Sequence, residues 1–291
     1  MRGQQHDIDD ADGDILPSTA PTTDQTECCP PQTAPTAPRP PHPHPPSDTQ
    51  GYELQGQYEK HGIFDKVYVT GPDNAGSALI VAYDIFGFWE TTLRGSDLLA
   101  SHLLLTCPTK IYMPDFFRGN PIPKEKDGDK EELARFFRGT AKLDDRLSEL
   151  LGFAKYLRTE KGFAHVGVLG YCWGGKLAIM SLAEPKVFDY GALVHPAMLV
   201  GGDGPKVQVP LALYASADEP KDVIHAITLA MADKKEWLYS EVYTYRTVHH
   251  GWAAARANLK DAENLKQYED VYQRLADFIS GRLGPQEKRT E

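Results

Sequence analysis

Cys172 lies where the sequence would place a nucleophile. It follows an apolar run at residues 166–169, and a helical stretch begins soon after it at Lys176. Gly170 and Gly174 stand two residues before and two residues after it, which is the spacing of the G-x-S-x-G nucleophile elbow with Cys in place of Ser. In such an elbow, small residues let a strand and a helix pass close around a strained turn that exposes the nucleophile. The alternative interpretation is a buried Cys in a Gly-rich turn.

A thiol nucleophile needs a histidine and an acid that orients it, and an acid follows later in the chain. Asp218 comes after a strand-like run at residues 210–214 and lies 46 residues beyond Cys172. We predict that Asp218, rather than Glu219 or Asp222, orients the histidine, because Asp218 comes directly at the end of the strand. Asp222 has the position of a first-turn acid of the next helix.

Two adjacent histidines, His249 and His250, follow the next strand-like run. The order nucleophile, acid, histidine is the one found in α/β-hydrolases. We predict that His250 carries the proton, because Gly251 lets the loop turn tightly and bring the ring over the sulfur. Adjacent side chains point different ways, and residue type alone does not decide between the two rings.

Strand and helix patterns alternate along the chain from Gly51 onward. Strands are predicted at residues 66–70, 78–83, 110–113, 166–169, 190–194, 210–214 and 238–245, and helices at 92–105, 131–138, 142–159, 176–180, 223–231 and 262–279. The run at 78–83 is continuously apolar, as expected for a strand that is covered on both faces. The alternation predicts an α/β fold with a doubly wound, mostly parallel sheet flanked by helices.

The first fifty residues differ in composition from the rest. They hold 11 of the 22 prolines, eight acidic residues and only two basic ones, so they carry six of the ten net negative charges. A segment with so few large apolar residues cannot bury enough surface to offset the entropy of ordering, so we predict a disordered tail at 1–50. A single domain is expected at 51–282, with a charged tail at 283–291. Residues 51–291 carry the remaining four net negative charges. This small negative charge gives no electrostatic reason to expect a nucleic-acid partner.

The N-terminus shows neither a secretory signal nor a transit-peptide pattern. No apolar run approaches the roughly 20 residues that span a bilayer. We therefore expect a cytoplasmic protein without a membrane partner. The four cysteines, Cys28, Cys29, Cys107 and Cys172, lack the spacing of a zinc site, so we expect no metal. Cys28 and Cys29 are interpreted as a bystander pair, with a redox or lipid-modification site as the alternative.

Five short motifs together resemble the dienelactone hydrolase family, and in detail its fungal-type intracellular members. They are Asp84-Ile85-Phe86-Gly87, Pro114-Asp115-Phe116-Phe117-Arg118, Gly170-Tyr171-Cys172-Trp173-Gly174-Gly175, Ala217-Asp218-Glu219-Pro220 and His250-Gly251-Trp252. The motif around Cys172 is the most specific of the five. The resemblance covers the chain from Gly51 to about Ile279. It implies an α/β-hydrolase fold and a carboxymethylenebutenolidase-like attack on an ester or lactone.

The resemblance also implies roles for individual residues. Cys172 would be the nucleophile, His250 the proton carrier and Asp218 its orienting acid, in a catalytic triad that forms an acyl-enzyme. The backbone amides of Ile85 and Trp173 would form the oxyanion hole. The family implies no cofactor, and we expect a monomer or a homodimer that acts on a small-molecule ester or lactone.

Asp84 stands where the family has a glutamate that hydrogen-bonds the resting thiol. Asp is one methylene shorter, so Asp84 either modulates the thiol of Cys172 or caps nearby backbone amides. The bacterial enzymes of the family hold a substrate carboxylate with two arginines, whose planar forks suit that group. Arg118 matches the first arginine. Arg256 is the arginine nearest to the second position, where this chain has Ala254.

The displacement of Arg256 by two residues leaves a more apolar ester, lactone or thioester as the alternative substrate. Two functions outside this class are further alternatives. One is an inactive scaffold, because fold alone does not fix function. The other is a redox-sensing thiol at Cys172, because an activated thiolate is also a target of oxidation.

Overall fold

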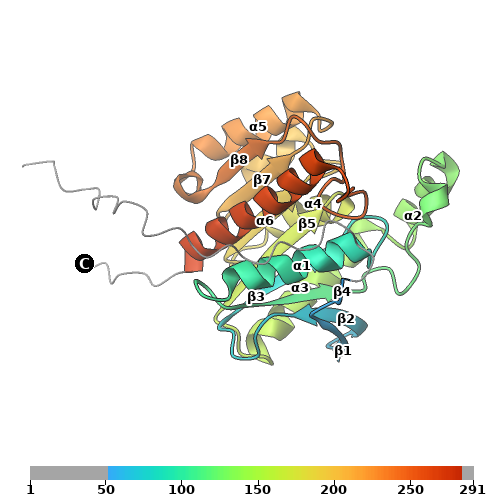
Figure 1. The fold of residues 1–291 in the computed structure, drawn as a ribbon. Coiled ribbons are helices and arrows are strands. Elements are labelled where there is room, and N and C mark those ends of the chain that lie inside the picture. The colour runs from blue at the N-terminus through green and yellow to red at the C-terminus, as the bar shows by residue number, and fades with distance from the viewer. Residues whose placement is uncertain (1–51, 284–291) are drawn as a thin grey trace, which may run out of the picture. The chain divides into compact units, whose positions relative to one another are not determined.

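The computed structural model describes residues 52–283, in which helices cover both faces of an eight-stranded sheet (Figure 1). The strands are β1 (Gln57–His61), β2 (Phe64–Thr70), β3 (Ser77–Ala82), β4 (Thr109–Pro114), β5 (His165–Tyr171), β6 (Tyr190–Val194), β7 (Leu211–Ala215) and β8 (Glu241–Thr244). The α-helices are α1 (Glu90–Leu103), α2 (Lys130–Arg138), α3 (Leu143–Thr159), α4 (Trp173–Ser181), α5 (Lys221–Ala232) and α6 (Ala262–Leu283). Short 3-10 helices occur at η1 (Lys124–Lys126), η2 (Gly201–Lys206) and η3 (Lys235–Tyr239). The tail predicted at 1–50, with Cys28 and Cys29, and residues 284–291 lie outside the described residues.

The sheet has the strand order β1-β2-β4-β3-β5-β6-β7-β8. The pairs β1-β2 and β2-β4 are antiparallel, and the other five pairs are parallel. From β3 to β4 the chain moves across the sheet toward β1, and from β4 to β5 it moves back toward β8. Right-handed crossovers therefore place α1 on one face and α3 and α4 on the opposite face. Helix α6 lies beside α1 (Figure 1), and the predicted doubly wound, mostly parallel sheet is confirmed.

The inner strands owe their continuous apolar sequences to this double cover. Every residue of β3, β6 and β7 is buried, as expected where helices lie on both faces of a parallel sheet. The candidate catalytic residues lie in loops after the carboxyl ends of three strands, with Cys172 after β5, Asp218 after β7 and His250 after β8. The buried strands β5 and β7 hold two of these loops on the packed part of the sheet, whereas the third loop follows the partly exposed edge strand β8.

The two outermost strands are where sequence-based expectation and structure differ. β1 was not predicted, because its sequence QYEKH is mostly polar and mostly exposed, as edge strands often are. The strand predicted at 238–245 is shorter in the structure, since η3 takes up its first residues and β8 begins only at Glu241. Edge strands bury one face or less, so the apolar alternation that marks a strand is weak there.

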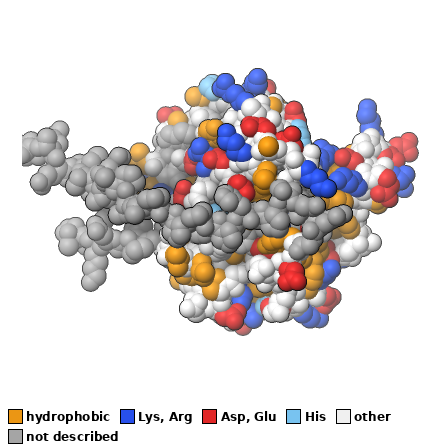
Figure 2. Space-filling view, in the orientation of Figure 1, with side chains coloured by type: hydrophobic (Ala, Val, Ile, Leu, Met, Phe, Trp, Pro, Cys, Tyr) orange, Lys and Arg blue, Asp and Glu red, His pale blue; other side chains and the backbone are white. Residues whose placement is uncertain are grey.

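Helix α2 stands on a projection that leaves the sheet after β4 (Figure 1). Phe136 is the one buried residue of α2. Side chains of both charge signs cover this projection (Figure 2). Asp129 caps the helix by accepting hydrogen bonds from the amides of Glu131 and Glu132.

Candidate active site

The elbow around Cys172 joins β5 to α4. Cys172 has φ 52° and ψ −114°, a conformation that costs a residue with a side chain about 1–3 kcal/mol. Two glycines make the turn fit. A Cβ on Gly170 would lie 2.1 Å from the carbonyl oxygen of Gly174, and a Cβ on Gly174 would lie 2.0 Å from the carbonyl oxygen of Ala82. The structure therefore has the predicted strand, strained turn and helix, and Cys172 is half-buried rather than enclosed in the core.

Backbone hydrogen bonds hold this strained residue from two sides. The amide of Cys172 donates to the carbonyl of Val194 at 3.3 Å, and its carbonyl accepts from the amides of Gly175 at 3.0 Å and Ala197 at 2.9 Å. Val194 and Ala197 belong to β6 and the loop that follows it. The neighbouring strand end therefore fixes the conformation that the elbow requires.

The ring of His250 lies between the thiol and a carboxylate. The ring lies close enough to Cys172 for the thiol to raise the pKa of His250, and its Nδ1 donates to Oε1 of Glu219 at 2.7 Å. Burial lowers the pKa of His250, but the contacts with Cys172 and Glu219 outweigh burial and raise the pKa from 6.5 to about 10. At neutral pH the ring therefore carries a second proton beside the sulfur.

The acid that contacts this ring is Glu219, and the expected contact with Asp218 is wrong. The carboxylate of Asp218 instead accepts a hydrogen bond from the backbone amide of His250 at 2.7 Å. Pro220 supplies the physical reason, since the residue before a proline is restricted to extended conformations, in which adjacent side chains point to opposite sides. Glu219 is buried and also accepts a hydrogen bond from the amide of Ser216, whereas Asp218 is exposed.

The structure also separates the two histidines. His249 is exposed, and its Nδ1 donates to the carbonyl oxygen of His250 at 2.9 Å. Gly251 has φ 93°, a conformation that favours glycine, so the loop turns sharply directly after His250. Of the two rings, it is that of His250 that reaches Cys172 and Glu219.

The amides of Ile85 and Trp173 lie at adjacent strand ends. β3 and β5 pair in parallel, with Ala82 opposite Gly170, so the residues that follow them leave the sheet side by side. Trp173 is the first residue of α4, and the first amides of a helix have no acceptor within it. The carbonyl of Ile85 accepts a hydrogen bond from the amide of Ile122 at 2.9 Å, which fixes the segment after β3.

Asp84 caps backbone amides and makes no hydrogen bond with Cys172 in the structure. Its Oδ1 accepts from the amide of Phe86 at 2.9 Å, and its Oδ2 accepts from the amide of Ala255 at 3.1 Å. Burial raises the pKa of Asp84 to about 6, although these hydrogen bonds and the nearby His250 act in the opposite direction. The carboxylate thus joins the segment after β3 to the loop that carries His250.

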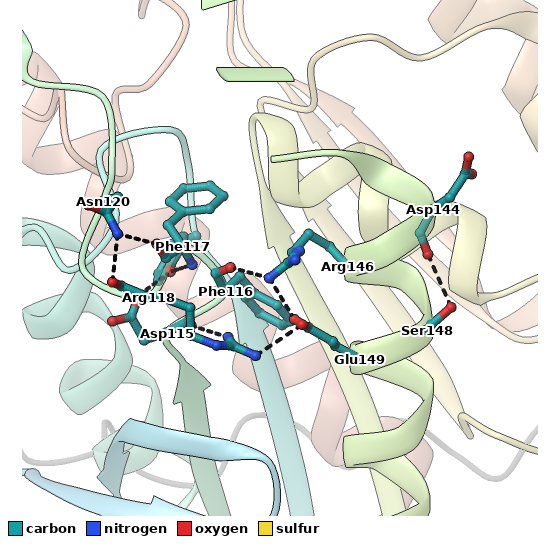
Figure 3. Close-up of polar contacts among 10 residues, drawn as sticks. Asp115, Phe116, Phe117, Arg118, Asn120, Asp144, Arg146, Ser148 and Glu149 are labelled. Atoms are coloured by element: carbon teal, nitrogen blue, oxygen red, sulfur yellow. Dashed lines mark hydrogen bonds and ion pairs between the residues drawn. The ribbon is translucent and has the colours of Figure 1, made fainter. Parts of the chain in front are cut away.

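Arg118 points toward Glu149 of α3 (Figure 3). Its guanidinium donates to the carbonyl of Asp115 at 2.6 Å and to Glu149 at 3.0 Å, and it stacks on the ring of Phe64 at 4.6 Å. Glu149 also pairs with Arg146. The expectation that Arg118 binds substrate therefore finds no support in its contacts.

Arg256 lies against the histidine loop, but a carboxylate holds its charge. Its Nη2 donates to both oxygens of Asp127 at 2.6 Å, and its guanidinium lies 5.6 Å from the centre of the Phe86 ring. Its side chain also packs against Gly251, where an added Cβ would lie 2.9 Å from Cβ of Arg256. Asp127 comes from the projection that bears α2, so this ion pair ties that projection to the loop after His250.

The sequence matches a family model over residues 66–282, most of the described domain, and the model is that of the dienelactone hydrolase family. The chain belongs to the dienelactone hydrolase family. An uncharacterized AIM2 family protein of Schizosaccharomyces pombe is 30% identical over 237 residues, which are 79% of this chain and 93% of that protein. A carboxymethylenebutenolidase homolog of Homo sapiens is 35% identical over 135 residues, which are 45% of this chain and 51% of that protein.

Solved structures support the same fold. A putative dienelactone hydrolase from Klebsiella pneumoniae superposes with a TM-score of 0.58 at 18% identity, covering 74% of this chain and 92% of that chain. A dienelactone hydrolase from Anabaena variabilis gives a TM-score of 0.56 at 15% identity, covering 79% of this chain and 99% of that chain. At these identities the comparison establishes the α/β-hydrolase fold of this dienelactone hydrolase family member, and no more than the fold.

A cavity of about 380 Å³ adjoins His250, and we call it the His250 cavity. Its walls come from the loop after β6, from the segment 218–220 and from the first turn of α5. Its lining residues are Pro196, Ala197, Met198, Leu199, Asp218, Glu219, Pro220, Val223, Ile224 and His250.

Lys176 of α4 pairs with Asp203, whose carboxylate also accepts a hydrogen bond from the amide of Val200. This ion pair holds the loop after β6 in place beside the elbow.

A buried histidine packs against the ring of His250. His195 is fully buried, and its ring packs edge-on against His250 at 5.0 Å and against Trp252 at 5.2 Å. Burial, together with the nearby charge of His250, holds the pKa of His195 well below its usual range. A neutral ring therefore lies beside the charged ring of His250, where a second imidazolium would be repelled.

Buried tyrosine hydroxyls connect the elbow strand with the histidine loop. Tyr171, which precedes Cys172, donates to the hydroxyl of Tyr272 on α6 at 2.9 Å, and Tyr272 donates to the carbonyl of Ala253 at 2.9 Å. A small residue at Gly95 of α1 is required here, because an added Cβ would lie 1.8 Å from the Tyr272 hydroxyl. We call this connection the tyrosine chain.

Within residues 52–283, no group of three or more His, Cys, Asp or Glu side chains is arranged to hold a metal ion. None of the helices in that part of the chain is both long and apolar enough to cross a bilayer.

Proposed function

We propose that this member of the dienelactone hydrolase family is a Cys-dependent hydrolase of carboxylic esters or lactones that works through an acyl-enzyme. The observation that carries the proposal is the arrangement of Cys172, His250 and Glu219 at the end of the elbow. Nucleophile, base and orienting acid within hydrogen-bonding reach of one another are the signature of an activated nucleophile. The raised pKa of His250 supports an imidazolium beside the sulfur, in position to protonate a leaving oxygen.

In the first half of the reaction, the Cys172 sulfur attacks the substrate carbonyl carbon and forms a carbon–sulfur bond. The carbonyl electron pair moves to oxygen, and the amides of Trp173 and Ile85 donate hydrogen bonds to the resulting oxyanion. The intermediate collapses, the bond to the alcohol oxygen breaks, and the His250 imidazolium gives that oxygen its proton. The products are a thioester on Cys172 and the free alcohol, which stays attached if the substrate is a lactone.

In the second half, His250 takes a proton from water, and the hydroxide oxygen attacks the thioester carbonyl. The bond to sulfur then breaks, which releases the carboxylic acid and restores thiolate and imidazolium. The buried carboxylate of Glu219 stabilises the charged ring in both halves. Asp218 positions the loop by holding the amide of His250, and Asp84 acts in the same way by joining that loop to the segment after β3.

Hydrolysis of p-nitrophenyl acetate before and after iodoacetamide treatment tests the proposal. We expect turnover that alkylation removes and that is lost in Cys172→Ala. Cys107 is the matched control, because it is the other described free cysteine and is buried, so Cys107→Ala keeps its activity and its sensitivity to iodoacetamide. A fully active Cys172→Ala protein would refute the mechanism. Inactivation of the thiol by peroxide with no ester turnover would favour the alternative of a thiol sensor.

A further inference from the structure

The His250 cavity has a composition that selects against charged substrates. Seven of its ten lining residues are apolar, and none of its lining residues is Lys or Arg. Apart from His250, its charged groups are the carboxylates of Asp218 and Glu219. Ligand sites are usually mostly apolar, with a few polar groups that fix orientation, but here the polar groups are acids that would repel a substrate carboxylate.

The two arginines that could offset those acids are held elsewhere. Arg118 pairs with Glu149 on α3, and both oxygens of Asp127 occupy Arg256. A guanidinium that already binds a carboxylate has lost the fork geometry and the net charge with which it would bind a second one. The site therefore lacks the carboxylate clamp that the family resemblance leads one to expect.

The cavity is lined by His250, and this contact indicates which part of the substrate enters it. His250 must protonate the departing oxygen, so the leaving group lies next to that ring, whereas the carbonyl oxygen faces the amides of Ile85 and Trp173. The cavity is lined by His250 and lies between the segment 218–220 and Met198. The alcohol portion of the substrate is thus the portion that contacts its apolar walls.

We propose that this site hydrolyses neutral esters and lactones whose alcohol portion is apolar and lies in the His250 cavity, and that it discriminates against substrates with a carboxylate there. This inference rests on the proposed function and specifies its substrate class. Each methylene buried against the apolar walls raises kcat/KM by about fourfold, as the transfer free energy of a methylene predicts. A carboxylate near Asp218 lowers kcat/KM at least about tenfold through like-charge repulsion.

A matched pair of acetate esters tests the charge preference. Methyl 4-acetoxybenzoate and 4-acetoxybenzoate share the acyl group and the ring, and they differ in charge at the far end of the leaving group. We expect kcat/KM, corrected for each ester's imidazole-catalysed rate, to be at least about tenfold higher for the neutral ester. Equal rates, or a faster reaction of the anion, would overturn the inference while the Cys172 mechanism, tested on p-nitrophenyl acetate, still stands. No thiol-dependent hydrolysis of any of the three esters would instead refute the proposed function, and the inference with it.

A charge placed on the cavity wall tests the location. Met198 lines the cavity and is 42% exposed, whereas Leu229 on α5 is 56% exposed and lies outside the lining. Both positions accept an arginine without disturbing the core. We expect Met198→Arg to raise the rate of the anion relative to the neutral ester at least about tenfold, with no such change in Leu229→Arg. The same change in both variants, or none in Met198→Arg, would show that the leaving group does not lie in this cavity.

Discussion

Replacing Glu219 with Gln removes one charge from the His250 ring while keeping the length of the side chain. The pKa of His250 is about 10 instead of 6.5, a difference worth about 5 kcal/mol in favour of the protonated ring. Cys172 and Glu219 both contribute to it against the effect of burial. If Glu219 supplies somewhat less than half, its loss costs the imidazolium on the order of 2 kcal/mol, or about 30-fold. We expect kcat/KM to fall by at least that factor, and by up to about 10⁴-fold if the neutral Gln also misorients the ring.

The assay is the pH dependence of kcat/KM for p-nitrophenyl acetate in Glu219→Gln and in Asp218→Asn. The apparent pKa of the histidine moves down toward its usual value in Glu219→Gln. Asp218→Asn keeps an oxygen that accepts from the His250 amide, so we expect less than about a tenfold loss and an unchanged pH profile. A larger loss in Asp218→Asn than in Glu219→Gln would refute the assignment of the acid.

Three further predictions concern the elbow and the histidines. His249→Ala retains kcat/KM within about threefold, because this exposed ring hydrogen-bonds a backbone carbonyl. His250→Ala loses several orders of magnitude of activity, and steady-state kinetics compare the two variants. Gly174→Ala places a Cβ 2.0 Å from the carbonyl oxygen of Ala82. Chemical denaturation should therefore show a free energy of unfolding that is lower by more than about 3 kcal/mol. In the control Gly152→Ala the added Cβ meets nothing within 4 Å, so the free energy of unfolding should rise slightly. Because the folded protein raises the pKa of His250, protonation of this ring stabilises the fold fully below pH 6.5, and the stabilisation is lost as the pH rises through about 10. The free energy of unfolding should therefore fall more steeply between these pH values in the natural protein than in His250→Gln.

Local chemistry made the fold and the strained elbow at Cys172 predictable from the sequence. The elbow depends on residues within a few positions of Cys172, and the requirement for Gly170 and Gly174 follows directly from the close approach of strand and helix. The buried strands were predicted for the same reason, since double cover makes them continuously apolar. β1 lacks that signal, because its polar residues lie at the edge of the sheet.

Which of two adjacent carboxylates contacts the His250 ring depends on the backbone conformation at residues 218–219. Asp218 and Glu219 are adjacent carboxylates at one strand end, and residue type does not distinguish them. The signal that was available is Pro220, which restricts the residue before it and turns neighbouring side chains to opposite sides. The carboxylate that points into the interior, that of Glu219, is the one that contacts the His250 ring.

The arginines could not be assigned from the sequence, because their partners are distant in it. Glu149 is 31 residues from Arg118, and Asp127 is 129 residues from Arg256. No local pattern predicts either ion pair. A motif match therefore places a guanidinium in the right segment without indicating which carboxylate will hold it.

The tyrosine chain has a consequence for how the protein opens. Tyr171, Tyr272 and Ala253 link the nucleophile strand, α6 and the histidine loop through buried hydrogen bonds, so no one of these parts can unfold without leaving a buried hydroxyl or carbonyl unpaired in the others. Segments coupled in this way exchange their amide hydrogens together, at a rate set by opening of the whole unit. The loop after His250 has no regular secondary structure, but we expect it to resist hydrogen exchange nearly as well as β5. Cys172 and His250 would then keep their relative positions until the domain itself unfolds.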